Sequence, residues 1–179
     1  MLLNLKEHKP TLLAKKGDMK TLSKNDMKTL SKKDLIDLLK TVLNKGISCR
    51  FQAKGFSMLP FIKNNDVITV SPLKNRIPGF GDVVAFIHPK TEKLTVHRIV
   101  GKRDNSYIIK SDKSFNIDGF IHKQNILGYL TKVERNGKEI HLGLGPEKFL
   151  IAFLARINIL SLIRFLWRFI HSIISKDKK

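Results

Sequence analysis

Short runs of β-forming residues fill the middle of this 179-residue chain and constrain its fold more than any other feature. Gly, Pro and Asn separate the runs, which cover residues 67–70, 82–87, 94–100, 107–109, 126–134 and 140–142. The last two runs flank Asn136-Gly137, a dipeptide typical of a two-residue hairpin turn. Several short strands with turn residues between them are typical of an all-β core. We therefore predict a mainly β fold with a compact core over residues 47–145.

A helix is predicted before this core, over residues 31–46. Ser31 and Asp34 have the spacing of a capping box, and Gly46 is suited to close the last turn. Between them, apolar residues recur at helical spacing: Leu35, Ile36, Leu38, Leu39, Val42 and Leu43. Residues 1–30 lack a sustained apolar pattern. An eight-residue near-repeat begins within them, with copies at 18–25 and 26–33. We expect residues 1–30 to form a flexible segment.

A second helix is predicted after the core, over residues 146–175, with Pro146 in the first turn. It is amphipathic, with polar side chains every three or four residues and a wide apolar face. The apolar sequence of this helix is interrupted by Arg156, Arg164 and Arg168. Its longest apolar run, 149–155, is shorter than the ~20 residues of a membrane span. A basic amphipathic helix is typical of a membrane interface, so we predict membrane-surface contact through residues 147–175. Packing on the β core or on a partner helix is the alternative.

The net charge of +19 is spread along the chain and attracts polyanions without selecting one. The even spread does not indicate a dedicated nucleic-acid-binding arm, and no specific nucleic-acid partner is expected. Cys49 is the only cysteine, which excludes an internal disulfide, and we expect it to be a small, partly buried residue. The six histidines lack ligand-like spacing, so no metal or other cofactor is predicted. The first residues also lack the pattern of a signal peptide.

Candidate chemistry begins at Gly55-Phe56-Ser57-Met58-Leu59-Pro60, where a turn between glycine and proline presents a serine. A serine hydroxyl is a weak nucleophile near neutral pH and needs an adjacent base. His97 interrupts an apolar strand and is the best candidate for that base. Asp112 and Asp118 follow in one loop, and a carboxylate can orient an imidazole. A structural strand histidine and solvated loop carboxylates are the alternative interpretation.

The order of these segments resembles the type I signal peptidases, specifically the serine–histidine branch found in archaea, the endoplasmic reticulum and some Gram-positive bacteria. Four blocks carry the resemblance, and together they span about residues 55–130. They are the serine segment 55–60, two strands at 65–70 and 81–86, the histidine segment 96–100, and the acidic segment 110–118 with 126–128. The resemblance implies a signal-peptidase-like β core. Typical bacterial members and the self-cleaving SOS repressors carry a lysine where this chain has His97.

The resemblance also implies an activity and a role for each matched residue. The chain would be a serine endopeptidase that cleaves a leader or pro-segment from a peptide or precursor protein through an acyl-enzyme. Ser57 would be the nucleophile, and its backbone N–H would help to hold the oxyanion. His97 would be the general base, Asp118 would orient it, and Asp112 would be a possible supporting acid. The enzyme would be membrane-associated, on a side that the sequence does not indicate.

Three positions depart from the family pattern. The place of the usual N-terminal membrane anchor holds the helix 31–46. Gly55 replaces a serine whose hydroxyl often assists the oxyanion. Ser111 and Lys113-Ser114 replace the usual glycine and asparagines of the acidic segment. These departures leave open a non-catalytic membrane- or peptide-binding module on the same fold. A nucleic-acid-binding self-cleaving regulator is a further alternative, although the sequence predicts only one N-terminal helix.

Overall fold

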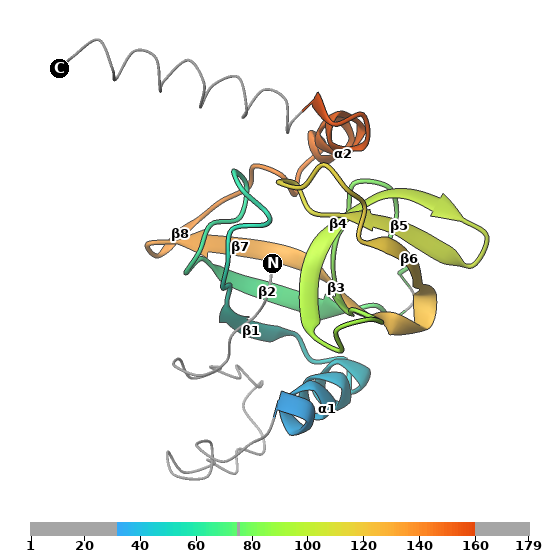
Figure 1. Cartoon of the computed structure of the whole chain (residues 1–179). Helices are drawn as coiled ribbons and strands as arrows, with labels where there is room; N and C mark the ends of the chain where they lie inside the picture. Colours follow the sequence, from blue (N-terminus) through green and yellow to red (C-terminus); the bar gives the residue numbers. More distant parts are fainter. Residues whose placement is uncertain (1–31, 75, 160–179) are drawn as a thin grey trace, which may run out of the picture.

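An antiparallel sheet of eight strands forms the body of the protein in a computed structural model that describes residues 32–74 and 76–159 (Figure 1). The strands follow the order β1-β2-β7-β3-β4-β5-β6, and β8 pairs with β7. Their bounds are β1 (Cys49–Gln52), β2 (Val67–Pro72), β3 (Val83–Ile87), β4 (Leu94–Arg103), β5 (Ser106–Lys110), β6 (Gly119–His122), β7 (Ile126–Arg135) and β8 (Lys138–Glu139). The prediction of a mainly β fold is confirmed.

The two faces of the curved sheet bury separate apolar clusters, because neighbouring side chains of a strand point to opposite faces. On β3, Val83 and Ala85 belong to a cluster that also includes residues of β1, β2 and the first helix. Val84 and Phe86 belong to the second cluster, with residues of β5 and β6. Strand β4 lies between β3 and β5 and is buried over its first eight residues. Burial on both faces includes the polar residues Thr95, His97 and Arg98, which lie among the apolar residues of this strand.

The helix predicted over residues 31–46 is confirmed as α1 (Lys32–Asn44). Leu39 and Leu43 are buried in the first cluster, as their helical spacing requires. Gly46 follows the helix with a φ of 80°, and its N–H bonds to the carbonyl of Leu43. This left-handed conformation suits glycine and ends the helix. Ser31 and the predicted flexible segment 1–30 lie outside the described residues.

The hairpin at Asn136-Gly137 is present, but its returning strand differs from the prediction. Both turn residues have positive φ values, of 51° and 76°. Such a two-residue turn places the very next residues opposite β7, so β8 is Lys138–Glu139 instead of residues 140–142. The N–H of Ile140 still bonds to Val133 before the chain leaves the sheet. The short strands β1 and β6 were not predicted individually, because four residues of mixed polarity carry little periodic signal.

The second helix, α2 (Lys148–Arg156), is shorter than predicted. It ends before Asn158, whose φ of 65° is left-handed, a conformation that asparagine tolerates better than most residues. The prediction of one helix over 146–175 is therefore wrong at Ile157–Asn158, and its residues 160–175 lie outside the described part of the chain. Among the described helices, none has the length and hydrophobicity that crossing a bilayer requires.

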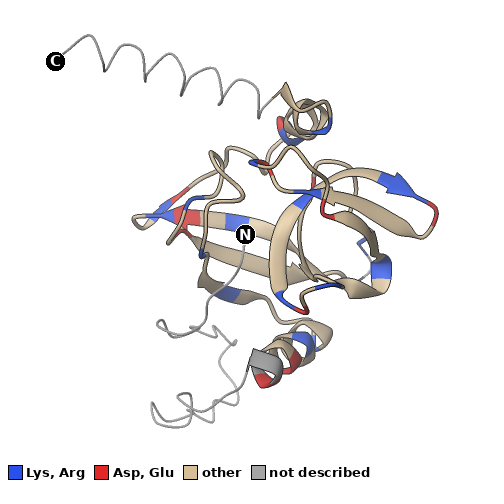
Figure 2. Cartoon of the chain, in the orientation of Figure 1, with Lys and Arg blue, Asp and Glu red and all other residues tan. Residues whose placement is uncertain are grey.

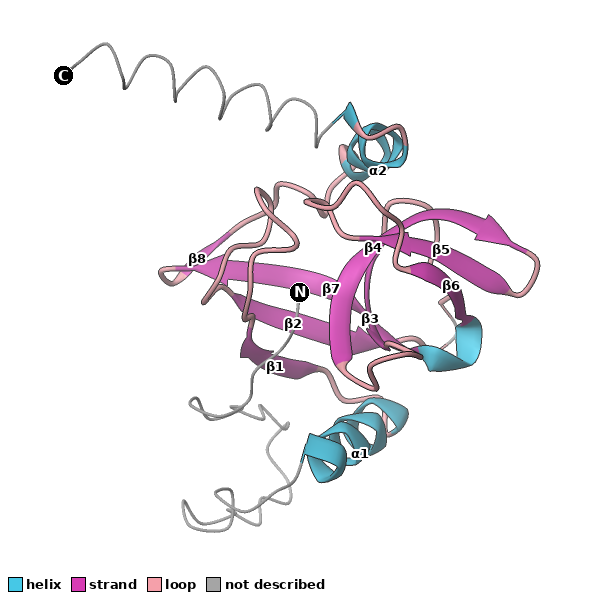
Figure 3. Ribbon diagram, in the orientation of Figure 1, coloured by secondary structure: helices cyan, strands magenta, loops and turns pink. Residues whose placement is uncertain are grey.

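Helix α2 packs on β4 with one face and leaves an apolar face exposed. Ile151, Ala152 and Ala155 are buried, as the core-packing alternative predicts. The exposed face consists of Phe149, Leu150, Phe153 and Ile157. Basic residues occur on both helices and on several strands (Figure 2), as the even spread of charge in the sequence indicates. Figure 3 shows both helices outside the sheet, at opposite ends of the molecule.

Candidate active site

Three side chains predicted from the sequence form one continuous line of hydrogen bonds. His97 Nε2 lies 3.0 Å from Ser57 Oγ, and His97 Nδ1 lies 2.6 Å from Asp118 Oδ2. Ser57 comes from the loop between β1 and β2, His97 from β4, and Asp118 from the loop between β5 and β6. Residues 21 and 40 positions apart in sequence therefore meet at one point. This is the geometry of a nucleophile, its base and the group that orients the base.

His97 is held in place by the strands around it. It pairs with Val84 of β3, and its ring centroid lies 6.1 Å from that of Phe86 on the same face. Only 8% of its side chain is exposed. A histidine in the middle of a buried strand has little freedom to rotate away. The sheet thus fixes the imidazole before any substrate arrives.

The hydrogen bonds of His97 determine which of its nitrogens carries the proton. An ionised carboxylate accepts hydrogen bonds and donates none. Nδ1 must therefore carry the hydrogen that is donated to Asp118. In the neutral imidazole this leaves the lone pair of Nε2 to accept the hydrogen of Ser57 Oγ. That tautomer is the one a general base requires.

Burial also keeps His97 in its basic form. Desolvation lowers the pKa of His97 below its ordinary value of 6.5, because burial penalises the charged imidazolium. The hydrogen bond and the charge of Asp118 act in the opposite direction without reversing the shift. The imidazole is therefore neutral near pH 7 and able to accept a proton. Asp118 still stabilises the imidazolium that forms when it does so.

The loop that carries Ser57 is shaped by a glycine and anchored by its neighbour. Gly55 has a φ of 104°, a conformation that side chains rarely allow, and its N–H bonds to Asn64 Oδ1 at 2.9 Å. Met58 is fully buried in the first cluster, and its carbonyl accepts the N–H of Ile62. Because Met58 is anchored in the first apolar cluster, the preceding Ser57 lies at the surface of the loop. This accounts for the local sequence pattern around the serine.

The acidic segment is bonded directly to the serine. The N–H of Lys113 donates to the carbonyl of Ser57 at 2.9 Å, and the N–H of Asp118 donates to the carbonyl of Ile109 at 2.9 Å. A further bond from the Ser114 N–H to Ser111 Oγ closes a turn within the segment. Both ends of the segment are thus fixed, and Asp118 is fixed relative to the nucleophile.

Asp112 pairs with Arg98, the residue after His97 on β4. Its two oxygens each accept a bond of 2.9 Å from Arg98, in a bidentate pair with no exposed side-chain surface. Arg98 Nη1 also donates to the carbonyls of Gly81 and Gly143, each at 2.9 Å. Arg98 is the residue that sequence reasoning missed. A basic side chain within an apolar strand was the available signal, since buried arginine is rarely unpaired.

The oxyanion side of the candidate site has a single identified donor. Within the described residues, the backbone N–H of Ser57 has no hydrogen-bond acceptor. It can therefore donate to a developing oxyanion, in the manner of peptidases that use the N–H of the nucleophile. Gly55 has no side chain with which to add a second donor. Phe56 and Ile117, the sequence neighbours of Ser57 and Asp118, are exposed, and Phe115 in the same acidic segment is exposed too.

Within the described residues, neither the cysteine nor the metal-ligating residue types provide a second catalytic centre. Cys49 is buried, and desolvation raises the pKa of its thiol to about 11, so the thiol stays protonated near neutral pH. The described residues contain no group of three or more His, Cys, Asp or Glu that could hold a metal ion.

Comparisons with known proteins identify no relative: no family model, curated protein or solved structure matches this chain. Function is therefore inferred from the fold and from the geometry around Ser57.

Proposed function

We propose that this chain is a serine endopeptidase of the signal-peptidase type, with a signal-peptidase-like β core and a Ser57–His97–Asp118 triad. The observation that carries the proposal is the unbroken line of hydrogen bonds at 3.0 and 2.6 Å through a buried, neutral imidazole. Its substrate is a peptide or precursor protein from which a leader or pro-segment is removed. The resemblance of the four sequence blocks supports the same assignment.

In the first half of the reaction, Ser57 Oγ attacks the scissile carbonyl carbon as its proton passes to His97 Nε2. The carbonyl oxygen becomes an oxyanion, to which the backbone N–H of Ser57 donates. His97, now an imidazolium held by Asp118, gives its proton to the leaving amine. The C–N bond breaks and leaves the acyl group on Ser57.

In the second half, water replaces the amine. His97 Nε2 takes a proton from the water as its oxygen attacks the acyl carbon. The proton then passes to Ser57 Oγ as the ester bond breaks, which restores the resting hydrogen bonds. Burial of His97 favours both steps, because its lowered pKa keeps it unprotonated before each attack.

A fluorophosphonate probe, which traps activated serine hydroxyls, provides the first test. We expect covalent labelling of the wild-type chain at Ser57, identified by mass spectrometry. Ser57→Ala should abolish the labelling, whereas Ser106→Ala at the start of β5 should not change it. Labelling of both variants to the same extent, or no labelling of the wild type, would contradict an activated serine. Co-expression with candidate precursors then tests cleavage itself.

We also propose that the enzyme associates with membranes through residues 147–175. The exposed apolar side chains Phe149 and Phe153 of α2 support this part of the proposal. A truncation after Ile159 retains α2, and the double variant Phe149→Ser, Phe153→Ser retains the tail. We expect each change to lower sedimentation with membranes. Unchanged sedimentation of both would exclude this segment as the anchor.

A non-catalytic peptide-binding module is the second candidate, and Gly55 favours it because one oxyanion donor of the family pattern is absent. Absence of probe labelling together with saturable peptide binding would select this candidate. A self-cleaving nucleic-acid-binding regulator has less support, since α1 is the only helix before the sheet in the described residues. Sequence-selective gel shifts would be needed to favour it.

A further inference from the structure

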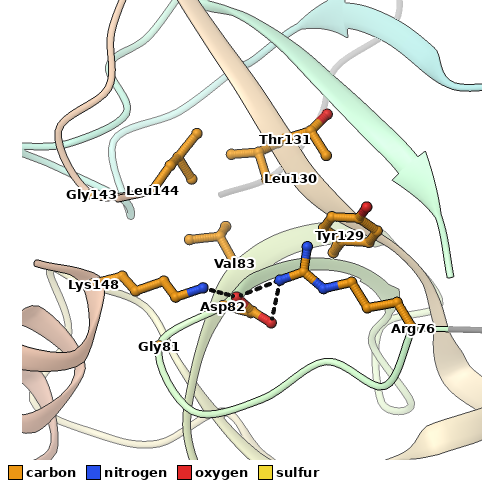
Figure 4. Close-up of a pocket in the computed structure, with 10 residues that line it drawn as sticks. All are labelled: Arg76, Gly81, Asp82, Val83, Tyr129, Leu130, Thr131, Gly143, Leu144 and Lys148. Carbon is orange, nitrogen blue, oxygen red and sulfur yellow. Dashed lines mark hydrogen bonds and ion pairs between the residues drawn. The ribbon is translucent and has the colours of Figure 1, made fainter. Parts of the chain in front are cut away.

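A cavity of about 170 Å³ lies beside α2, and the proposed reaction does not use it (Figure 4). Arg76 enters it from the loop before β3 and Lys148 from the first turn of α2. Figure 4 shows both side chains directed at Asp82, which lies between them. Tyr129 of β7 lines the wall behind Arg76. Three segments that are distant in sequence, 76–83, 129–131 and 143–148, thus enclose one polar space.

Among the described residues, Asp82 is the one carboxylate that lines this cavity, and it is already saturated with hydrogen bonds. Asp82 accepts from Arg76 Nη2 at both oxygens, at 3.1 and 3.0 Å, from the N–H of Gly79 at 2.9 Å, and from Lys148 Nζ at 2.7 Å. A carboxylate has about four acceptor positions, and these four bonds occupy them. Burial raises the pKa of Asp82, but the Gly79 N–H and Lys148 outweigh it and hold the pKa below its ordinary value. Asp82 therefore remains an acceptor that is fully occupied.

The cations of the cavity, in contrast, retain donors. Lys148 has three ammonium hydrogens, of which one is directed at Asp82, and its Nζ also lies 5.2 Å from the Phe149 ring centroid. The Arg76 guanidinium lies 3.9 Å from the centroid of the Tyr129 ring, which holds the guanidinium plane in place. Two cations against one carboxylate leave an excess of one positive charge. The cavity therefore offers donors and positive charge, without a free carboxylate acceptor.

The cavity is separate from the candidate active site. Val83 points into it in Figure 4 and pairs across the sheet with Arg98. His97 pairs with the next residue, Val84, on the opposite face of the strands. A ligand in the cavity would therefore not contact the imidazole. The two sites can be tested independently.

We propose that this cavity binds a phosphate group through Lys148 and Arg76. Ammonium and guanidinium groups are the side chains that bind phosphate most strongly, and here both are partly preorganised by Asp82. The volume of about 170 Å³ is well above the ~10–15 Å³ that one water needs by this measure, so a phosphate group with waters fits. The group can belong to a free phosphate ion or to a lipid headgroup, since exposed Phe149 adjoins Lys148.

Backbone amide NMR with the isotope-labelled full chain tests the site directly. Titration with inorganic phosphate should shift the amide signals of the cavity residues Gly81, Gly143 and Thr131 in a saturable way. Sodium chloride at matched ionic strength should not. Lys148→Met should weaken phosphate binding by about tenfold or more, because one charged hydrogen-bond donor is lost, and Lys148→Arg should restore it. Lys132→Met, at an exposed ion pair on β7, serves as the matched control and should bind as the wild type does.

Two results would overturn the proposal. One is a uniform, non-saturating shift of signals along the basic surface, and the other is equal binding by Lys148→Met and the wild type. Arg76→Gln is a second variant in case Lys148→Met does not fold. Binding to lipid vesicles then distinguishes the two sources of phosphate. If the protein binds phosphatidylglycerol vesicles but not phosphatidylcholine vesicles, and Lys148→Met abolishes this binding, the ligand is a lipid headgroup. If inorganic phosphate binds saturably but the vesicles do not bind, the ligand is a free phosphate ion.

Discussion

Two consecutive residues of β4 each bind an aspartate from the same loop. The two pairs differ in burial, in the number of hydrogen bonds and in the ability to exchange a proton. His97 faces the second apolar cluster and holds Asp118 through one hydrogen bond of 2.6 Å. Arg98 faces the other side and holds Asp112 through two bonds of 2.9 Å. Asp118 is 18% exposed at its side chain, whereas neither side chain of the Arg98–Asp112 pair is exposed at all.

The difference separates a reactive pair from a structural one. An arginine cannot release its proton in a protein, so the Arg98–Asp112 pair has no acid–base function. Its two bonds instead join β4 to the start of the acidic loop, while Gly81 and Gly143 receive the remaining donors. The imidazole of His97 can accept and release a proton, and one of its nitrogens reaches Ser57. We infer that the first pair performs the chemistry and that the second positions the loop that supplies Asp118.

Loss of the base should have the largest effect. His97→Gln keeps much of the side-chain volume but removes the basic nitrogen, so probe labelling of Ser57 should fall by roughly 10⁶-fold, to below detection. Rates of fluorophosphonate labelling measure this directly. Thermal unfolding should show that the variant remains folded. A variant that labels at a tenth of the wild-type rate would exclude His97 as the base.

Asp118→Asn should have the next largest effect, a decrease of about 10⁴-fold in labelling rate, by analogy with serine peptidases in general. The amide can donate to Nδ1 and favour the wrong tautomer, which leaves no lone pair facing Ser57. The same rate measurement applies. Asn116→Asp in the same loop is a useful control because it alters charge without contacting His97 through any described hydrogen bond. Equal rates for Asp118→Asn and the wild type would reverse the assignment of the two pairs.

Asp112→Ala should act on stability instead. It leaves the buried guanidinium of Arg98 without its counter-charge, which typically costs about 3–5 kcal/mol of unfolding free energy. Urea denaturation measures the loss. Asp37→Asn, at an exposed pair with Lys40 on α1, should change stability by less than about 1 kcal/mol. If Asp112→Ala is as stable as Asp37→Asn, the pair does not hold the acidic loop.

The smallest effect is a shift in pH dependence. Because burial lowers the pKa of His97, the labelling rate should rise with pH to a plateau, with a midpoint below 6.5. Below that midpoint the rate should fall tenfold per pH unit, as expected for one essential unprotonated group. Asp118 raises the pKa of His97, so the residual activity of Asp118→Asn should have a still lower midpoint. A midpoint above 6.5 would contradict the buried, neutral imidazole.

Most elements could be predicted because their signals are local. The helical spacing of Leu39 and Leu43 and the closing Gly46 predicted α1, and Asn136-Gly137 predicted the hairpin. The end of α2 at Arg156 could not be predicted in this way, because the apolar pattern continues past it. Its contacts with β4 are non-local: Arg156 Nη1 donates to the carbonyl of Val100, and buried Lys110 donates to Ala155 and Asn158 at the helix end.

The sequence by itself determined the longer strands β2, β3, β4, β5 and β7, since periodicity and turn residues act over a few positions. It also singled out Ser57, His97 and Asp118 as candidate site residues. The resemblance already implied that Asp118 orients His97, but only the tertiary structure showed that Asp112 pairs with Arg98. Asp112 and Asp118 share one loop, and the pairing of β4 with β5, with its irregularity between Ile99 and Gly101, sets which carboxylate reaches which face. Side chains alternate across a strand, so a displacement of one residue exchanges the faces. The cavity at Asp82 likewise exists only because three separate segments meet there.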